Sequence, residues 1–150
     1  HKMFEEHSVK KIYHAIAVTN KKNQIKDSFF IENYMGRISP KSSAAKWGFV
    51  PEKNGGLYSK TEFKILNKSN YKNMDLFYIE AQLKTGRTHQ IRVHLSSAGL
   101  PLLGDELYGG IPEKRIMLHS KCLEFIHPIT KQQLKIDAPI PDFFNKYYNL

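Results

Sequence analysis

The chain has 150 residues, the size of one ordinary domain, and its 41% hydrophobic and 12% aromatic residues are enough for a packed core rather than a disordered chain. Its 23 lysines and arginines outnumber 14 acidic residues, and the formal charge of +9 favours an anionic partner such as nucleic acid, although dispersed solvated lysines explain it equally well. No apolar run reaches the roughly 18 residues of a membrane span, and the start "HKMFEEHSVKK" lacks the apolar core of a secretory signal.

The single cysteine, Cys122, allows no internal disulfide. This favours a reducing, cytoplasmic location, although many exported proteins also lack disulfides. The first residue is His1 rather than Met, so we interpret the chain as a piece of a longer protein or a processed product.

The first predicted element is a strand over residues 11–19, "KIYHAIAVT", which is rich in β-branched and aromatic residues. It is apolar on both faces, which is typical of a central strand. Residues 33–58 carry glycines, prolines and serines and are predicted to be loops around one short strand or turn. Three basic residues of this middle segment can either contact phosphates or stay solvated, namely Arg37, Lys41 and Lys46.

Two further strands are predicted from a strict alternation of apolar residues. Residues 59–66, "SKTEFKIL", place one set of side chains on a single face: Thr61, Phe63 and Ile65. Residues 76–83, "LFYIEAQL", do the same with Phe77, Ile79, Ala81 and Leu83. We expect both faces to contribute to the core.

One segment, residues 88–98, has the pattern of a helix. Thr85 or Thr88 is expected to cap its first turn, and Gly99 to end it in the left-handed conformation. Its apolar stripe at positions i, i+4 and i+7 consists of Ile91, Leu95 and Ala98.

The C-terminal third is predicted to hold a hairpin and a short helix. Residues 115–127 and 132–139 flank "PITK", a plausible turn, and "PDFFNKYYNL" at 141–150 can form the helix. The predicted fold is therefore α+β, with a mostly antiparallel sheet and few helices.

Arg92 lies on the flank of the apolar stripe, where it is expected to be half-buried. The helix supplies no carboxylate on the same face, and a guanidinium cannot lose its charge to escape burial. An unpaired buried charge costs several kcal/mol or more, so Arg92 needs an anion from another element or from a ligand.

The loop before the helix, "KTGR", is a candidate anion-binding corner. The free N–H groups and the positive end of the helix dipole point toward it, Gly86 permits close approach, and Lys84 and Arg87 add charge. A capped helix with ordinary surface cations fits the same residues equally well.

Other catalytic signatures are missing from the sequence. His89 and His94 are five residues apart and so lie on different helix faces, which disfavours a metal pair. The sequence contains no HExxH, CxxC, P-loop or Gly-x-Ser-x-Gly motif. His119 and His127 are interpreted as strand or hairpin residues rather than ligands.

Together, "KTGRTHQIRVHLSSAGLPLLGDELYG", "LHSKCLEFIHPITKQQLKIDAPIPDFF" and "SVKKIYHAIAV" resemble the motifs of the RluA-type (RluD-like) pseudouridine synthases. The resemblance runs from about residue 5 to 144 and is poor over 27–58. These enzymes convert uridine to pseudouridine in RNA, so the resemblance implies an isomerase acting on ribosomal or transfer RNA. It implies no cofactor or metal, and we expect neither a DNA partner nor membrane association.

The resemblance also implies roles for individual residues. Tyr13 matches the tyrosine that stacks on the flipped uracil and is proposed to take its C5 proton, Arg92 the arginine that pairs with the catalytic aspartate, and Ile91 the apolar residue of the base pocket. The other candidates for substrate contact are Lys84, Arg87, Thr88 and Gln90. Gln90 and His89 are expected to brace the loop as well, and Asp105 to fix a turn. Further phosphate contacts are predicted for Arg115 and Lys121.

The family's catalytic aspartate belongs to a His-Arg-Leu-Asp segment upstream of the tyrosine, and this sequence has none. We therefore interpret residues 1–150 as the C-terminal portion of one catalytic domain, inactive alone, in which the partner of Arg92 lies outside the chain. Alternatives are a non-catalytic RNA-binding module on the same scaffold, and a basic protein that binds an acidic protein surface.

Overall fold

The structure, a computed structural model, describes residues 9–19, 25–71 and 73–148. Its seven strands are β1 (Lys10–Thr19), β2 (Ser28–Arg37), β3 (Trp47–Phe49), β4 (Leu57–Tyr71), β5 (Met74–Leu83), β6 (Leu118–Ile126) and β7 (Gln133–Asp137). Its helices are α2 (Gln90–Ser97) and α3 (Asp142–Asn145), with single 3₁₀ turns η1 (Glu52–Asn54) and η2 (Glu106–Tyr108). Within these ranges, no helix has the length and apolar character needed to cross a bilayer.

All seven strands belong to one antiparallel sheet in the order β3-β2-β4-β5-β1-β6-β7. β1 pairs with β5 on one side and β6 on the other, so the predicted central strand is confirmed. The predicted α+β class, with an antiparallel sheet and few helices, is confirmed as well.

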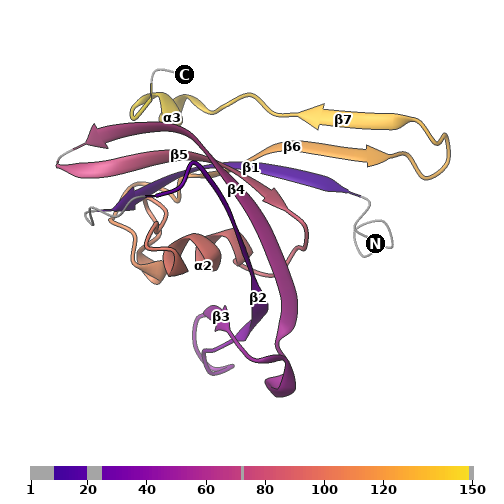
Figure 1. The fold of residues 1–150 in the computed structure, drawn as a ribbon, viewed down its shortest axis with the longest axis horizontal. Coiled ribbons are helices and arrows are strands. Elements are labelled where there is room, and N and C mark those ends of the chain that lie inside the picture. Colours follow the sequence, from indigo (N-terminus) through magenta and orange to yellow (C-terminus); the bar gives the residue numbers. More distant parts are fainter. Residues whose placement is uncertain (1–8, 20–24, 72, 149–150) are drawn as a thin grey trace.

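The two faces of the sheet are covered by different segments (Figure 1). Helix α2 lies against one face, over the strands in the middle of the sheet, and α3 lies on the opposite side. The alternation of each strand decides which side chains meet which cover. On the α2 face, alternate residues of β1, β4 and β5 form one buried cluster with Ile91 and Leu95 of the helix. On the other face, Ile16, Val18 and Tyr78 pack against the C-terminal segment.

The strands predicted over residues 59–66 and 76–83 are confirmed as parts of β4 and β5, and the side chains expected on their inward faces are buried. The hairpin prediction is confirmed too: β6 and β7 pair antiparallel around the predicted turn. His127 acts there as a hairpin residue, since its Nδ1 accepts the Thr130 N–H at 3.1 Å.

The prediction of loops around one short strand over residues 33–58 is wrong for its first part. β2 pairs with β4 over eight residues, and Asn33 and Gly36, which disfavour strands locally, lie within it. Pairing along a long neighbouring strand overrides this local preference. The short strand expected farther along is β3.

The helix-capping prediction is confirmed at the end of α2 and wrong at its start. Gly99 follows the helix with a φ of 76°, as expected. Neither Thr85 nor Thr88 caps the start, so that prediction is wrong: His89 precedes the helix with φ 57°, and its side chain makes no capping hydrogen bond. The predicted C-terminal helix is confirmed as α3. Residues 5–8 of the resemblance, and 149–150 of the predicted helix, lie outside the described residues.

Candidate active site

Arg92 has a carboxylate partner within this chain. Its Nε donates to Oδ2 of Asp105 at 2.8 Å, and its Nη2 donates to Oδ1 at 2.7 Å, a planar bidentate pair. The Asp105 side chain is 1% exposed and that of Arg92 15%. The prediction that Arg92 lacks a carboxylate partner within the chain is therefore wrong. Helix geometry shows that α2 itself carries no acid beside Arg92. It does not show that the chain returns over the helix 13 residues later and brings Asp105 to Arg92.

Tyr108 completes the setting of this arginine. Its ring centroid lies 4.8 Å from the Arg92 guanidinium carbon, a cation–π contact. The ring is held in turn by its hydroxyl. This group lies 2.9 Å from His89 Nδ1, within hydrogen-bond distance, and accepts a hydrogen bond from the backbone N–H of Trp47 at 2.9 Å. Ser96 of α2 donates to the Tyr108 carbonyl at 2.6 Å. These hydrogen bonds join the turn that carries Tyr108 to α2 and to His89, the residue before the helix.

The backbone of the turn requires glycine at its start. Gly104 has φ 85°, and a Cβ there would lie 2.1 Å from the carbonyl oxygen of Arg115. The sequence prediction for Asp105 was a turn residue that accepts backbone N–H groups. Its backbone carbonyl does accept from Tyr108 and Gly110, but its carboxylate binds Arg92. The side-chain role was missed because it depends on this turn.

Tyr13 lies on the α2 face of the sheet. It is partly buried and packs against the cluster that contains Ile91, which is 4% exposed. Its cross-strand neighbours, Ala81 and Ser120, are small. The structure therefore brings Tyr13 and Ile91 to one side of the sheet. That Tyr13 and Arg92 line one cleft stays a prediction.

Gln90 uses its whole side-chain amide inside the protein. Nε2 donates to the Lys60 carbonyl and to Thr61 Oγ1, and Oε1 accepts from Thr85 and from the Arg87 N–H. The side chain is 2% exposed, so the bracing role expected for it is confirmed. Thr88, in contrast, is exposed at the mouth of the loop. Its contact with substrate, like that of Gln90, stays a prediction.

The predicted anion corner around Gly86 is already partly occupied by internal contacts. Lys84 forms an ion pair with Glu62 at 2.9 Å, and Arg87 Nε donates to the Tyr58 carbonyl at 2.8 Å. The N–H of Arg87 is taken by Gln90, as described above. Both cations remain partly exposed, so they can still meet an anion from solvent.

Lys11 is a further cation at this corner that the sequence reasoning missed. It lies two residues before Tyr13 and so on the same face of β1, and a Cβ on Gly86 would be 3.4 Å from its Nζ. Burial lowers the pKa of its ammonium group, and the charge of Arg87 lowers it further. The alternation of β1 is the signal that places it beside Tyr13.

Three of the five remaining basic candidates have partners within the chain. Arg115 lies over the Phe143 ring at 4.2 Å, and Lys121 pairs with Asp137. Arg37 donates to the carbonyls of Ser39, Pro40 and Ser43 and so shapes its own loop. Lys41 and Lys46 are exposed. Phosphate contact by any of them stays a prediction.

A buried polar network lies directly beneath α2. His94 is fully buried; its Nδ1 is 3.0 Å from Thr61 Oγ1, and its Nε2 is 3.2 Å from both Ser59 Oγ and Asn33 Oδ1. An amide oxygen only accepts, so Nε2 carries the proton and the Thr61 hydroxyl donates to Nδ1. Burial lowers the pKa of His94 to about 4, which keeps the ring neutral. The network fixes the helix that carries Arg92.

Comparison with known proteins decides the family. The sequence model of the family described as RNA pseudouridylate synthase matches residues 1–97, a range that includes Tyr13, Ile91 and Arg92. The chain belongs to the RNA pseudouridylate synthase family. The match ends before Asp105, so the acid that holds Arg92 lies outside the matched range.

Curated relatives place this pseudouridylate synthase chain among the RluA-type enzymes. It is 50% identical over 76 residues to the RNA pseudouridine synthase YjbO of Bacillus subtilis, covering 49% of this chain and 27% of the relative. It is 38% identical over 105 residues to ribosomal large subunit pseudouridine synthase D of Haemophilus influenzae, covering 59% and 31%. An RNA pseudouridine synthase of Synechocystis sp. is 32% identical over 152 residues, covering 93% and 48%. The chain spans about half or less of the length of these relatives.

Solved structures of pseudouridylate synthase domains share the fold. Human RNA pseudouridylate synthase domain containing 1 superposes with a TM-score of 0.78 at 26% identity, covering 97% of this chain and 60% of that one. Human RNA pseudouridylate synthase domain containing 4 superposes with a TM-score of 0.70 at 22% identity, which supports the fold alone.

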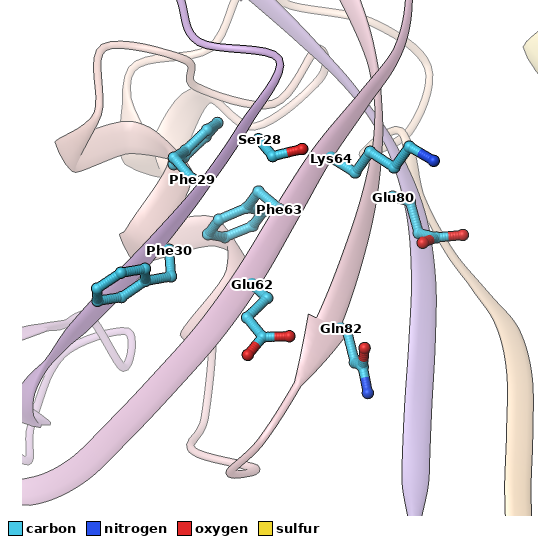
Figure 2. Close-up of a pocket in the computed structure, with 8 residues that line it drawn as sticks. All are labelled: Ser28, Phe29, Phe30, Glu62, Phe63, Lys64, Glu80 and Gln82. Atoms are coloured by element: carbon cyan, nitrogen blue, oxygen red, sulfur yellow. The ribbon is translucent and has the colours of Figure 1, made fainter.

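Of two hollows on this synthase chain, the second includes a predicted site residue, Lys84, in its lining. One of about 400 Å³ is formed by side chains of β2, β4 and β5 (Figure 2). Its charged lining residues are Glu62, Glu80 and Lys64, and none of the predicted site residues is among them. Another of about 410 Å³ is lined in part by Lys10, Lys84 and Thr85, next to the loop before α2. Neither hollow is lined by Tyr13 or Arg92. In the described ranges, no three His, Cys, Asp or Glu side chains gather as a metal site requires.

Proposed function

We propose that the intact protein isomerises uridine to pseudouridine in ribosomal or transfer RNA. The observation that carries this proposal is the family match over residues 1–97, which covers the tyrosine strand and the arginine helix together. Further support comes from the rigid setting of Arg92 on α2 and from the position of Tyr13 above the same side of the sheet.

The reaction breaks the C1′–N1 bond of the nucleotide, turns the uracil and joins C1′ to C5, after which C5 loses its proton and N1 gains one. A base inside a stem is out of reach, so the nucleotide has to be flipped from the stack. Tyr13 provides an aromatic surface for the uracil and, in this proposal, removes the C5 proton. Ile91 contributes an apolar wall. Arg92 supplies positive charge that keeps a neighbouring carboxylate ionised.

We propose further that the catalytic aspartate belongs to polypeptide outside these 150 residues, and that residues 1–150 form the C-terminal part of one catalytic domain. The support is that no His-Arg-Leu-Asp segment occurs in the sequence. Asp105 does not replace it, because its carboxylate is 1% exposed and both of its oxygens are bound to Arg92. Residues 1–150 alone are then inactive.

RNA affinity is proposed to come from phosphate contacts near the loop before α2. Lys11, Lys84, Arg87 and Arg92 lie on or beside this loop and helix, which gives the region a concentration of positive charge. Counterion release makes such binding weaken as salt increases.

The test is tritium release from ribosomal and transfer RNA transcripts that carry [5-³H]uridine, because the C5 hydrogen leaves during the isomerisation. We expect the full-length protein to release tritium and residues 1–150 to release none. Arg92→Met is expected to reduce the single-turnover rate at least about 100-fold, which corresponds to about 2.7 kcal/mol. Lys68→Met, which removes a cation paired with Asp27 away from the site, is the matched control and should retain the rate.

The same experiment separates the alternatives. Salt-sensitive RNA binding by the full-length protein without tritium release would favour a non-catalytic RNA-binding module on this scaffold. Failure to bind RNA at all would favour a basic protein that binds an acidic protein surface. Strong tritium release by residues 1–150 alone would contradict the external aspartate.

A further inference from the structure

The Asp105 carboxylate is bound to only one edge of the Arg92 guanidinium. It takes the edge formed by Nε and Nη2, which leaves the two Nη1 protons and one Nη2 proton, the end of the fork, without a partner among the described residues. Nη1 is also not among the buried side-chain atoms of these residues that lack a hydrogen bond, so it keeps some exposure to solvent. The guanidinium therefore has a second planar edge suited to a carboxylate.

The acid, the ring and the helix together fix the direction of that second edge. The Asp105 side chain is 1% exposed, and the Tyr108 ring lies 4.8 Å from the guanidinium carbon. A buried bidentate pair costs desolvation energy and is seldom a net source of stability, so its observed geometry needs another reason. Orientation of Arg92 provides one.

We propose that Asp105 is a positioning residue that holds Arg92 by its side edge, so that the end of the guanidinium faces the catalytic carboxylate. This inference rests on the proposed function, which supplies the second acid. Asp105 touches neither substrate nor the reacting atoms. Its negative charge also has a consequence of its own: it offsets the charge of Arg92, so the catalytic carboxylate is close to a neutral pair rather than to a bare cation.

The charge argument predicts a shift that a purely structural residue would not cause. In Asp105→Asn, a like charge near the catalytic carboxylate is removed while the charge of Arg92 remains, so the pKa of that carboxylate falls. The acid limb of the kcat profile should then move to lower pH. At the optimum, the loss of orientation should lower kcat at least about tenfold, which is about 1.4 kcal/mol, with KM for RNA within about twofold.

Two other titratable groups face this pair, His89 and Tyr108. The pKa of His89 is lowered by burial and then by Arg92, and raised by Asp105; that of Tyr108 is raised by burial and lies far above the acid limb. His89 could therefore shift the profile by itself. The experiment repeats the Asp105→Asn measurement in a His89→Gln background, where the same displacement of the acid limb is expected.

The experiment uses the full-length protein, with Glu106→Gln as the control. Glu106 is exposed and adjacent, so this variant removes the same charge without touching Arg92 and should keep the wild-type kcat and profile. An unchanged kcat, or a reduced kcat with an unmoved acid limb in Asp105→Asn, would overturn the proposal.

A measurement on the wild-type protein keeps the proposal testable if Asp105→Asn fails to fold or if no isomerisation is found. The Nε–H of Arg92 should give a slowly exchanging ¹⁵N NMR signal, because it is bound to a buried carboxylate, whereas that of the exposed Arg115 should exchange rapidly. Equally rapid exchange at both would overturn the positioning role. Absence of tritium release, together with slow exchange at the Arg92 Nε–H, would refute the proposed function and leave the Arg92–Asp105 pair in place.

Discussion

The two faces of the central sheet are stabilised in different ways. Beneath α2, the apolar cluster is accompanied by a buried network of hydrogen bonds. The network joins His94 and Gln90 to β2, to β4 and to the loop before α2. On the opposite face, Tyr78, Tyr147 and Tyr148 gather around Phe144 in a mainly aromatic cover, in which the Tyr78 and Tyr147 hydroxyls bond to His14 and Glu113. Hydrogen bonds fix direction, while aromatic packing mainly removes apolar area from water. The face that carries Arg92 is therefore specified more narrowly than the face that carries the C-terminal segment.

The largest expected effect is on the aromatic face. Phe144→Ala removes a fully buried ring and should lower the free energy of unfolding by about 3–5 kcal/mol, as measured by urea denaturation. The matched control is Phe30→Ala, since Phe30 is 62% exposed and should change stability little. The activity per folded molecule of the full-length protein should survive Phe144→Ala. A selective loss of kcat would show that the two faces are not separable in this way.

The next effect is a pH dependence on the α2 face. The pKa of His94 is about 4 in the fold, below the ordinary value of 6.5, so the unfolded chain binds the proton more tightly. The stability from neutral His94 is complete above about pH 6.5 and is lost as pH falls toward 4, by up to about 3 kcal/mol. Urea denaturation between pH 7.5 and 4.5 measures this slope.

His94→Gln should remove the largest part of that slope, and His127→Gln, at the hairpin, should leave it in place. His14 and His89, whose pKa values are also lowered mainly by burial, should account for the remainder. If the free energy of unfolding of His94→Gln depends on pH as strongly as that of the wild type, burial of a neutral His94 is not the cause of the pH dependence.

A smaller effect is expected from Gln90→Leu. The change keeps the volume approximately but leaves the Arg87 N–H without its partner and the Lys60 carbonyl with only the Lys84 N–H, so we expect a loss of about 1–3 kcal/mol. Gln82→Leu, on the face of β5 turned away from α2, is the control and should stay within about 0.5 kcal/mol. Equal losses in both would contradict the special role assigned to the network.

The smallest effect is expected at the loop before α2. Lys84→Gln breaks a partly exposed ion pair with Glu62 and should change stability by less than about 1 kcal/mol. If Lys84 meets a phosphate, the slope of log affinity for RNA against log salt should decrease by about one. Lys68→Gln should leave that slope unchanged.

The sequence was sufficient for the parts of the fold governed by local periodicity. The strands around Phe63 and Ile79 and the helix containing Ile91 follow from alternation or from a 3.6-residue repeat, and each was predicted. β2 was not predicted, because Asn33 and Gly36 disfavour a strand locally and the pairing with β4 overrides them. The motif residues of the site could be located, but their orientation could not.

Asp105 illustrates the limit most clearly. Its local sequence predicts a turn, and a turn is what forms; nothing in that segment indicates where the carboxylate is directed. The contact with Arg92 exists because the chain after α2 returns over the helix, a property of the tertiary fold. The same holds for Lys11, whose proximity to Gly86 depends on the pairing of β1 with β5.

β4 has fifteen residues and serves both parts of the sheet. Its first half pairs with β2 and supplies Ser59 and Thr61 to the polar network, and its second half pairs only with β5, above the aromatic face. A strand shared in this way couples the melting of one part to the other. Denaturation should therefore appear as one sigmoidal transition, with circular dichroism and tyrosine fluorescence superimposable, and damage at either end of β4 should be felt across the whole domain.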